Sequence, residues 1–129
     1  MAVAVTSAVL DALLAEARAA HPRECCGLLF GTAAMIAGHQ PAANVHPMPE
    51  THFEIDPQVL IDAHRATREG RARLVGYYHS HPSGRPEPSA TDCELAAGDG
   101  MIWAIMGQGH VALWLDGSNG FSALSYTKL

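Results

Sequence analysis

Hydrophobic residues return along the chain at two spacings, one typical of helices and the other typical of strands. Between Ser7 and about Ala20 apolar residues recur every three or four positions, which predicts an amphipathic helix capped by Thr6 or Ser7. The same start and stop signals predict two further helices, at 57–69 and 89–98, with Asp56 and Ser89 as their caps.

Short apolar runs that end in glycine, proline or polar residues predict the strands. We expect them at 3–5, 25–31, 33–40, 53–56, 73–81, 101–107, 110–116 and 121–127. Helices therefore interleave with strands, and this order favours an α/β sandwich with a mixed, mostly antiparallel sheet flanked by helices. The 129 residues suit one domain over 1–129, and we find no repeat or linker.

Charge and composition narrow the classes of partner. Only 8 residues are lysine or arginine and the formal net charge is −5, so nucleic acid and anionic membrane are poor partners. The apolar start lacks a positively charged leading segment, because its first basic residue is Arg18, and Asp11 and Glu16 interrupt it. We therefore expect this segment to belong to the fold of a cytoplasmic protein.

The three cysteines, Cys25, Cys26 and Cys93, are an odd number and include one adjacent pair, which is a poor basis for disulfides. We expect buried free thiols in a reducing compartment. The sequence contains no Cys-x-x-Cys pair, which is the spacing typical of a thiolate metal site.

The stretch "HSHPSGRPEPSATD", residues 79–92, carries the candidate chemistry. His79 and His81 are two apart on a predicted strand, so their side chains share one face at a Cα spacing of about 6.5–7 Å. With Asp92 they offer three zinc ligands and leave a fourth position open. The alternatives are histidines on a solvated strand face, and a capping box formed by Ser89 and Asp92 at a helix start.

Upstream, Glu24 stands just before an apolar strand, where a carboxylate is suited to take a proton from a water. An exposed glutamate in a turn is the alternative.

Together these residues resemble the JAMM metalloprotease family, also called MPN+ or JAB, and in particular its stand-alone prokaryotic members. The resemblance covers nearly the whole chain and includes the stretches "LVGYYHSHP" and "NVHPMPETHFEIDP". It implies a cytidine-deaminase-like α/β sandwich. The matching motif residues are Glu24, Gly27, His79, Ser80, His81, Pro82, Ser89 and Asp92.

The resemblance also implies a role for each of five residues. His79, His81 and Asp92 match the ligands of one zinc ion per chain. Glu24 matches the general base for the catalytic water, and Ser89 matches the residue that stabilises the oxyanion. None of the five is replaced, so the chain resembles an active member of the family.

By the same resemblance, the expected activity is that of a peptidase or isopeptidase acting after the C-terminal Gly-Gly of a ubiquitin-like protein or a β-grasp sulfur carrier. An extended tail of this kind can add as a strand beside the site. The alternative is a non-catalytic MPN-type scaffold or binding module, against which the intact motif argues. The identity of the substrate and the presence of a homodimer stay open.

Overall fold

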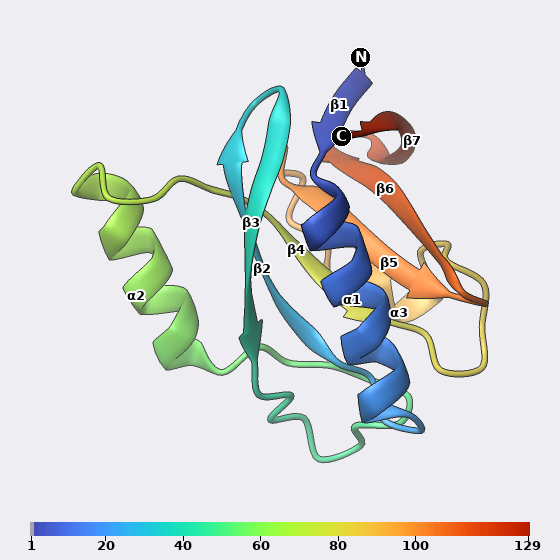
Figure 1. Cartoon of the computed structure of the whole chain (residues 1–129). Coiled ribbons are helices and arrows are strands. Elements are labelled where there is room, and N and C mark those ends of the chain that lie inside the picture. Colours follow the sequence, from blue (N-terminus) through green and yellow to red (C-terminus); the bar gives the residue numbers. More distant parts are fainter. Residues whose placement is uncertain (1) are drawn as a thin grey trace.

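Seven strands and three helices make up the part of the chain that the computed structural model describes, residues 2–129 (Figure 1). In chain order they are β1 (Ala2–Val5), α1 (Ser7–Ala20), β2 (Cys26–Thr32), β3 (Met35–Ala42), α2 (Pro57–Arg68), β4 (Leu74–Ser80), α3 (Ala90–Leu95), β5 (Ile102–Gly107), β6 (His110–Gly117) and β7 (Gly120–Lys128).

The strands form one mixed sheet in the order β1-β3-β2-β4-β5-β6-β7, which confirms the predicted α/β class. The pairs β2–β3, β2–β4, β5–β6 and β6–β7 are antiparallel, whereas β4–β5 is parallel. The sheet closes on itself because β1 pairs in parallel with both β3 and β7. The stretch 79–92 begins at the end of β4, the fourth of the seven strands in this order.

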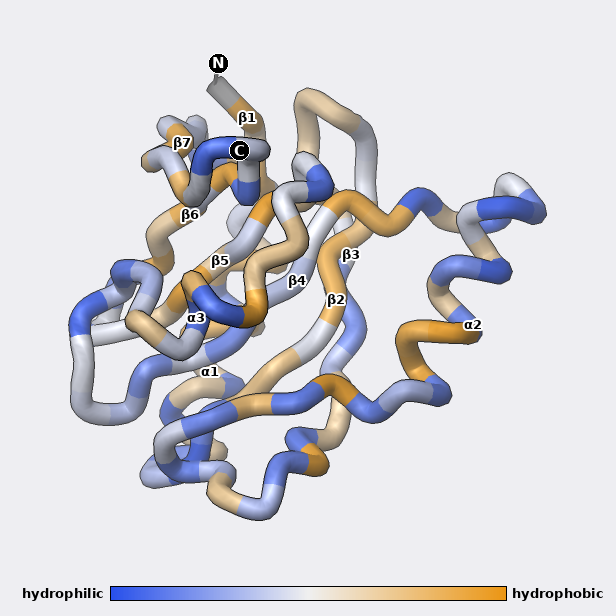
Figure 2. The backbone as a smooth tube through the Cα atoms, turned by 180° about the vertical axis from the view of Figure 1, so that it is seen from behind, coloured by the Kyte–Doolittle hydropathy of each residue, from blue (hydrophilic) through white to orange (hydrophobic). Residues whose placement is uncertain are grey.

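Helices cover the sheet at two places and each seals its own apolar cluster. α1 contributes Val9, Leu10 and Leu13 to the larger cluster, which also contains Leu29 of β2. α2 lies beside the β2–β3 pair and away from β6 and β7 (Figure 1), and its cluster contains Leu28. Adjacent residues of β2 thus point to opposite clusters, as strand geometry requires. The hydrophobic stretches of β2 and β5 stand out in Figure 2.

The three predicted caps are confirmed. The Thr6 side chain accepts from the Val9 N–H, and the Asp56 carboxylate accepts from the Gln58 N–H. Ser89 caps α3 and belongs to a complete capping box. Each cap satisfies an amide that the helix itself leaves without a partner.

Two predicted boundaries are wrong. α3 ends at Leu95 and does not reach residue 98, because the Asp116 carboxylate accepts from the Ala97 and Gly98 N–H groups at 3.0 and 3.1 Å and draws this backbone out of the helix. The predicted strand at 53–56 is a single bridge, in which Asn44 pairs with Ile55. The chain turns directly from this bridge into the cap of α2.

Cys25 and Cys26 are buried free thiols, as predicted, but Cys93 is exposed, which corrects the expectation for that residue. It follows Asp92 on α3, and a helix turns by about 100° per residue. The side chain after a buried Asp92 therefore faces outward. Across residues 2–129, none of the helices has the length and apolar character that a membrane crossing requires.

Gly27, one of the motif residues, lies where β2 passes the ring of Tyr78. A Cβ atom at this position would be 2.4 Å from both Cζ and Oη of Tyr78 and from the Gln40 carbonyl oxygen. Tyr78 is fully buried and its hydroxyl donates to Glu16 at 2.7 Å, so the ring has no free space to move into. We expect Gly27→Ala to lower the free energy of unfolding by about 1–3 kcal/mol in denaturant titrations.

Gly38→Ala on β3 is the matched control for this prediction. A Cβ atom there would meet only the Phe30 Cβ, at an ordinary 3.9 Å. Its effect should stay within about 0.5 kcal/mol. Equal stabilities of the two variants would contradict the close-contact explanation for Gly27.

Candidate metal centre

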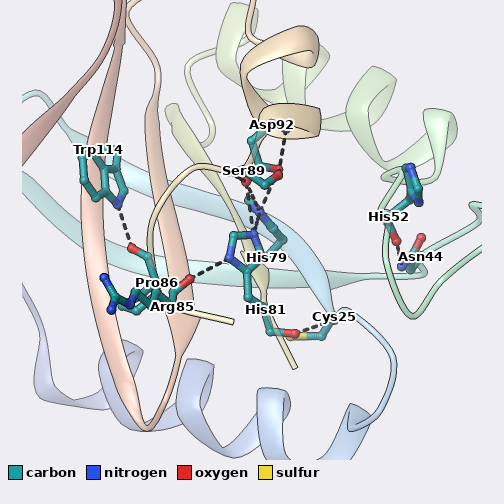
Figure 3. Close-up of polar contacts among 11 residues, drawn as sticks. Cys25, Asn44, His52, His79, His81, Arg85, Pro86, Ser89, Asp92 and Trp114 are labelled. Atoms are coloured by element: carbon teal, nitrogen blue, oxygen red, sulfur yellow. Dashed lines mark hydrogen bonds and ion pairs between the residues drawn. The ribbon is translucent and has the colours of Figure 1, made fainter. Parts of the chain in front are cut away.

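Three potential ligand atoms converge where β4 ends and α3 begins (Figure 3). The Nε2 atoms of His79 and His81 are 3.1 Å apart. Each lies 3.1 Å from the Oδ2 atom of Asp92. Two ligands bonded to zinc at 2.0–2.1 Å in a tetrahedral arrangement are separated by about 3.3 Å. The spacing of these three side chains therefore fits one zinc ion.

The second imidazole nitrogen of His81 agrees with this assignment. His81 Nδ1 lies 2.8 Å from the Arg85 carbonyl oxygen, which can only accept, so Nδ1 carries the proton and the Nε2 lone pair faces the cluster. His79 Nδ1 is buried and has no hydrogen-bond partner within residues 2–129.

Burial and hydrogen bonds oppose each other in setting the pKa values of the three potential ligands, and burial prevails only at His79. Complete burial lowers the pKa of His79, which keeps its imidazole neutral, as a ligand must be. Burial alone would raise the pKa of Asp92, but its hydrogen bonds with His79 and His81 hold that pKa far below the usual range. Burial alone would lower the pKa of His81. Its hydrogen bonds to Asp92 and to the Arg85 carbonyl oxygen outweigh burial, so the pKa of His81 is raised.

Ser89 and Asp92 form a capping box as well as part of the site. Ser89 Oγ accepts from the Asp92 N–H at 3.1 Å, and Asp92 Oδ2 accepts from the Ser89 N–H at 2.9 Å. The same carboxylate faces both histidines. The interpretation of "SATD" as a capping box is therefore compatible with Asp92 as a potential metal ligand. The helix start fixes the direction in which Asp92 points.

The loop between β4 and α3 is anchored from β6, a contact that the sequence did not reveal. Trp114 Nε1 donates to the Pro86 carbonyl oxygen at 3.0 Å (Figure 3). Together with the bond between His81 and the Arg85 carbonyl, this holds the proline-rich segment between the ligands. An indole in a late strand has no periodicity or spacing that would indicate this partner.

Glu24 lines the same cleft as His81 and is only 7% exposed, which rules out the exposed-turn alternative. With His81 and Ser89 it lines a cleft of about 260 Å³. Burial raises the pKa of its carboxyl to about 7; the charge of His81 lowers it and that of Asp92 raises it. The structure thus brings together all five residues that the sequence singled out, and their catalytic roles stay predictions.

Comparison with known proteins assigns the chain to a family. Residues 6–116 match the prokaryotic homologs of the JAB domain. The desampylase of Haloferax volcanii is 36% identical over 101 residues, which cover 74% of this chain and 73% of that protein. The CysO-cysteine peptidase of Mycobacterium tuberculosis is 33% identical over 90 residues, covering 68% of this chain and 61% of the relative.

A protein of Desulfitobacterium hafniense, solved in solution, has the same fold. It superposes with a TM-score of 0.83 at 27% identity and covers 100% of this chain and 93% of its own. Fold, motif and relatives agree: the chain is a hydrolase of peptide or isopeptide bonds and belongs to the prokaryotic homologs of the JAB domain.

Proposed function

We propose that the chain is a zinc-dependent peptidase or isopeptidase that cuts after the C-terminal Gly-Gly of a ubiquitin-like or sulfur-carrier protein. The observation that carries this proposal is the convergence of His79 Nε2, His81 Nε2 and Asp92 Oδ2 beside the buried Glu24. Relatives named desampylase and CysO-cysteine peptidase support the substrate class.

In this proposal three residues bind the metal and a fourth transfers protons. His79, His81 and Asp92 would hold a zinc ion, which when bound would supply Lewis acidity and lower the pKa of the catalytic water to about 7. Glu24 accepts a proton from the attacking water and returns it to the leaving amine. A carboxyl whose pKa is raised to about 7 suits both transfers near neutral pH.

Ser89 has one hydrogen-bonding function left for the substrate. Its Oγ accepts from the Asp92 N–H, so the hydroxyl proton is available to donate. At the rim of the cleft it would donate to the oxygen on which charge develops as the carbonyl is attacked. Loss of such a donor typically lowers the rate by about 10²–10³-fold.

The cleft suits a tail without side chains. Besides Glu24 and His81, its walls include the small residues Ser83, Gly84 and Ser89. Its volume is about 260 Å³. A Gly-Gly tail needs space only for its backbone.

The test is cleavage of a β-grasp carrier whose C-terminal Gly-Gly is joined to a short peptide, followed by mass spectrometry. We expect release of the peptide by the zinc-loaded chain, loss of activity after chelation, and recovery with added zinc. A carrier ending in Val-Val is the matched control and should be cut far more slowly. Chelator-resistant cleavage would contradict the metal mechanism, and binding of the Gly-Gly carrier without cleavage would favour the non-catalytic module.

A further inference from the structure

The side chain of Asn44, in the loop after β3, uses its full hydrogen-bonding capacity. Its Nδ2 donates to the carbonyl oxygens of Glu24 and His52 at 3.0 and 2.9 Å. Its Oδ1 accepts from the N–H groups of His46 and Glu54, both at 3.1 Å. An amide offers two donors and two acceptor sites, so none is left over. Figure 3 shows the contact with His52.

Three of these four bonds connect the segment that carries the proposed base to the segment that carries Phe53. The partners His52 and Glu54 flank Phe53 on either side, and the third, Glu24, is the base itself. A second contact ties the same segments, because the Glu24 N–H donates to the Pro49 carbonyl oxygen at 2.7 Å. The position of Phe53 relative to Glu24 is therefore fixed through Asn44.

Phe53 in turn stacks on the imidazole of His79, with ring centroids 4.2 Å apart and planes 17° from parallel. Trp103 meets the same imidazole edge to face at 5.7 Å and 87°. Metal-binding histidines are usually oriented by a hydrogen bond from the other ring nitrogen. His81 has that bond, to the Arg85 carbonyl, but His79 Nδ1 has no partner within residues 2–129. Aromatic packing is thus the contact available to set the plane of His79.

We propose that Phe53 and Asn44 are positioning residues of the metal centre. Phe53 fixes the plane of the His79 ring, and Asn44 holds Phe53 and the main chain of Glu24 in one arrangement. The inference rests on the proposed metal site, and its first test does not depend on the substrate. Ligand geometry must be held to within about 0.5 Å and 10–20°, so loss of either contact affects the metal before it affects the fold.

The first experiment measures zinc affinity by competition with a chromophoric chelator. Phe53→Leu should bind zinc about 10–100-fold more weakly than the parent, the range typical of residues that orient a ligand. Phe53→Tyr keeps the ring and should restore affinity. The visible absorption of the cobalt-substituted protein should change in Phe53→Leu and match the parent in Phe53→Tyr.

Phe121→Leu is the matched control, because it makes the same substitution in the same aromatic cluster. Phe121 packs on Trp103 at 4.9 Å and 69°. Phe121 is thus one ring removed from His79, which Trp103 contacts directly. This variant should keep parental zinc affinity and the parental cobalt spectrum.

The second experiment addresses Asn44. Asn44→Asp keeps the shape and the acceptor oxygens but loses both donated bonds, and Asn44→Ala controls for the added charge. Both should lower zinc affinity and, at saturating zinc, should lower kcat more than they raise KM, because the base is displaced. Met48→Ala, in the same loop and 55% exposed, should leave all of these quantities unchanged.

Equal zinc affinity of Phe53→Leu and Phe121→Leu would overturn the role of Phe53, as would failure of Phe53→Tyr to restore affinity. Parental kcat and zinc affinity in both Asn44 variants would overturn the role of Asn44. If the parent itself fails to bind zinc, the proposed metal site is wrong, and the positioning roles of Phe53 and Asn44 are rejected with it.

Discussion

Glu24→Gln is expected to abolish cleavage while zinc stays bound and the fold stays intact. The amide has nearly the shape of the carboxylate but cannot take a proton, and general-base catalysis contributes about 10²–10⁴-fold in rate. The ligand atoms on His79, His81 and Asp92 are untouched. The measurements are kcat on the Gly-Gly carrier, zinc content by mass spectrometry, and the unfolding midpoint.

The same variant has an expected effect on stability in the metal-free protein. Burial raises the pKa of Glu24 to about 7 from the ordinary value of 4.5, so its protonated form is favoured in the fold. That contribution is complete below pH 4.5 and is lost as the pH rises through about 7. Above pH 7 the parent buries a charge that glutamine lacks, so Glu24→Gln should be at least as stable there.

Glu54→Gln, which neutralises an exposed carboxylate of the neighbouring loop, is the control and should keep parental kcat. Full activity in Glu24→Gln would remove Glu24 from the mechanism. Loss of zinc together with activity would show instead that Glu24 acts on the metal site as a whole.

The double variant His79→Ala/His81→Ala is expected to lose its metal. Purified without chelator, the parent should contain about one zinc per chain and the variant almost none, because two of three ligands are gone. Metal content by mass spectrometry checks this directly. His64→Ala, which removes an exposed histidine of α2, should keep the parental content.

Equal zinc in the parent and the double variant would place the metal elsewhere. If neither took up added zinc, the histidines would be packing residues and Ser89 a helix cap alone.

Local sequence signals predicted the elements well, and interactions between distant segments account for the errors. Caps such as Asp56 and Ser89 act within a few residues of themselves, so their sequence signal is sufficient. The early end of α3 depends on Asp116, about twenty positions away. The closure of the sheet through β1 has no local signal either, because both partners of β1 are distant strands.

The residues of the candidate site also fall into those that local sequence patterns predict and those that only the folded chain reveals. The i, i+2 spacing of His79 and His81 and the capping box at Asp92 are local patterns with a direct geometric meaning. The place of Glu24 came from resemblance alone, since spacing says nothing of a residue so far upstream. Asn44 and Phe53 lie in a proline-rich loop without periodicity, so their contacts emerge only from the folded chain.

The closed sheet also constrains how the protein is made. β1 is synthesised long before its parallel partner β7, because Ala2–Val5 pair with Ser125–Lys128. The Leu129 N–H adds a bond to the Val5 carbonyl oxygen at 2.9 Å. The larger apolar cluster, which contains Val3 and Leu124, therefore cannot be completed before β7 has been synthesised. Such distant contacts slow folding, and the core of this domain stays incomplete until β7 emerges from the ribosome.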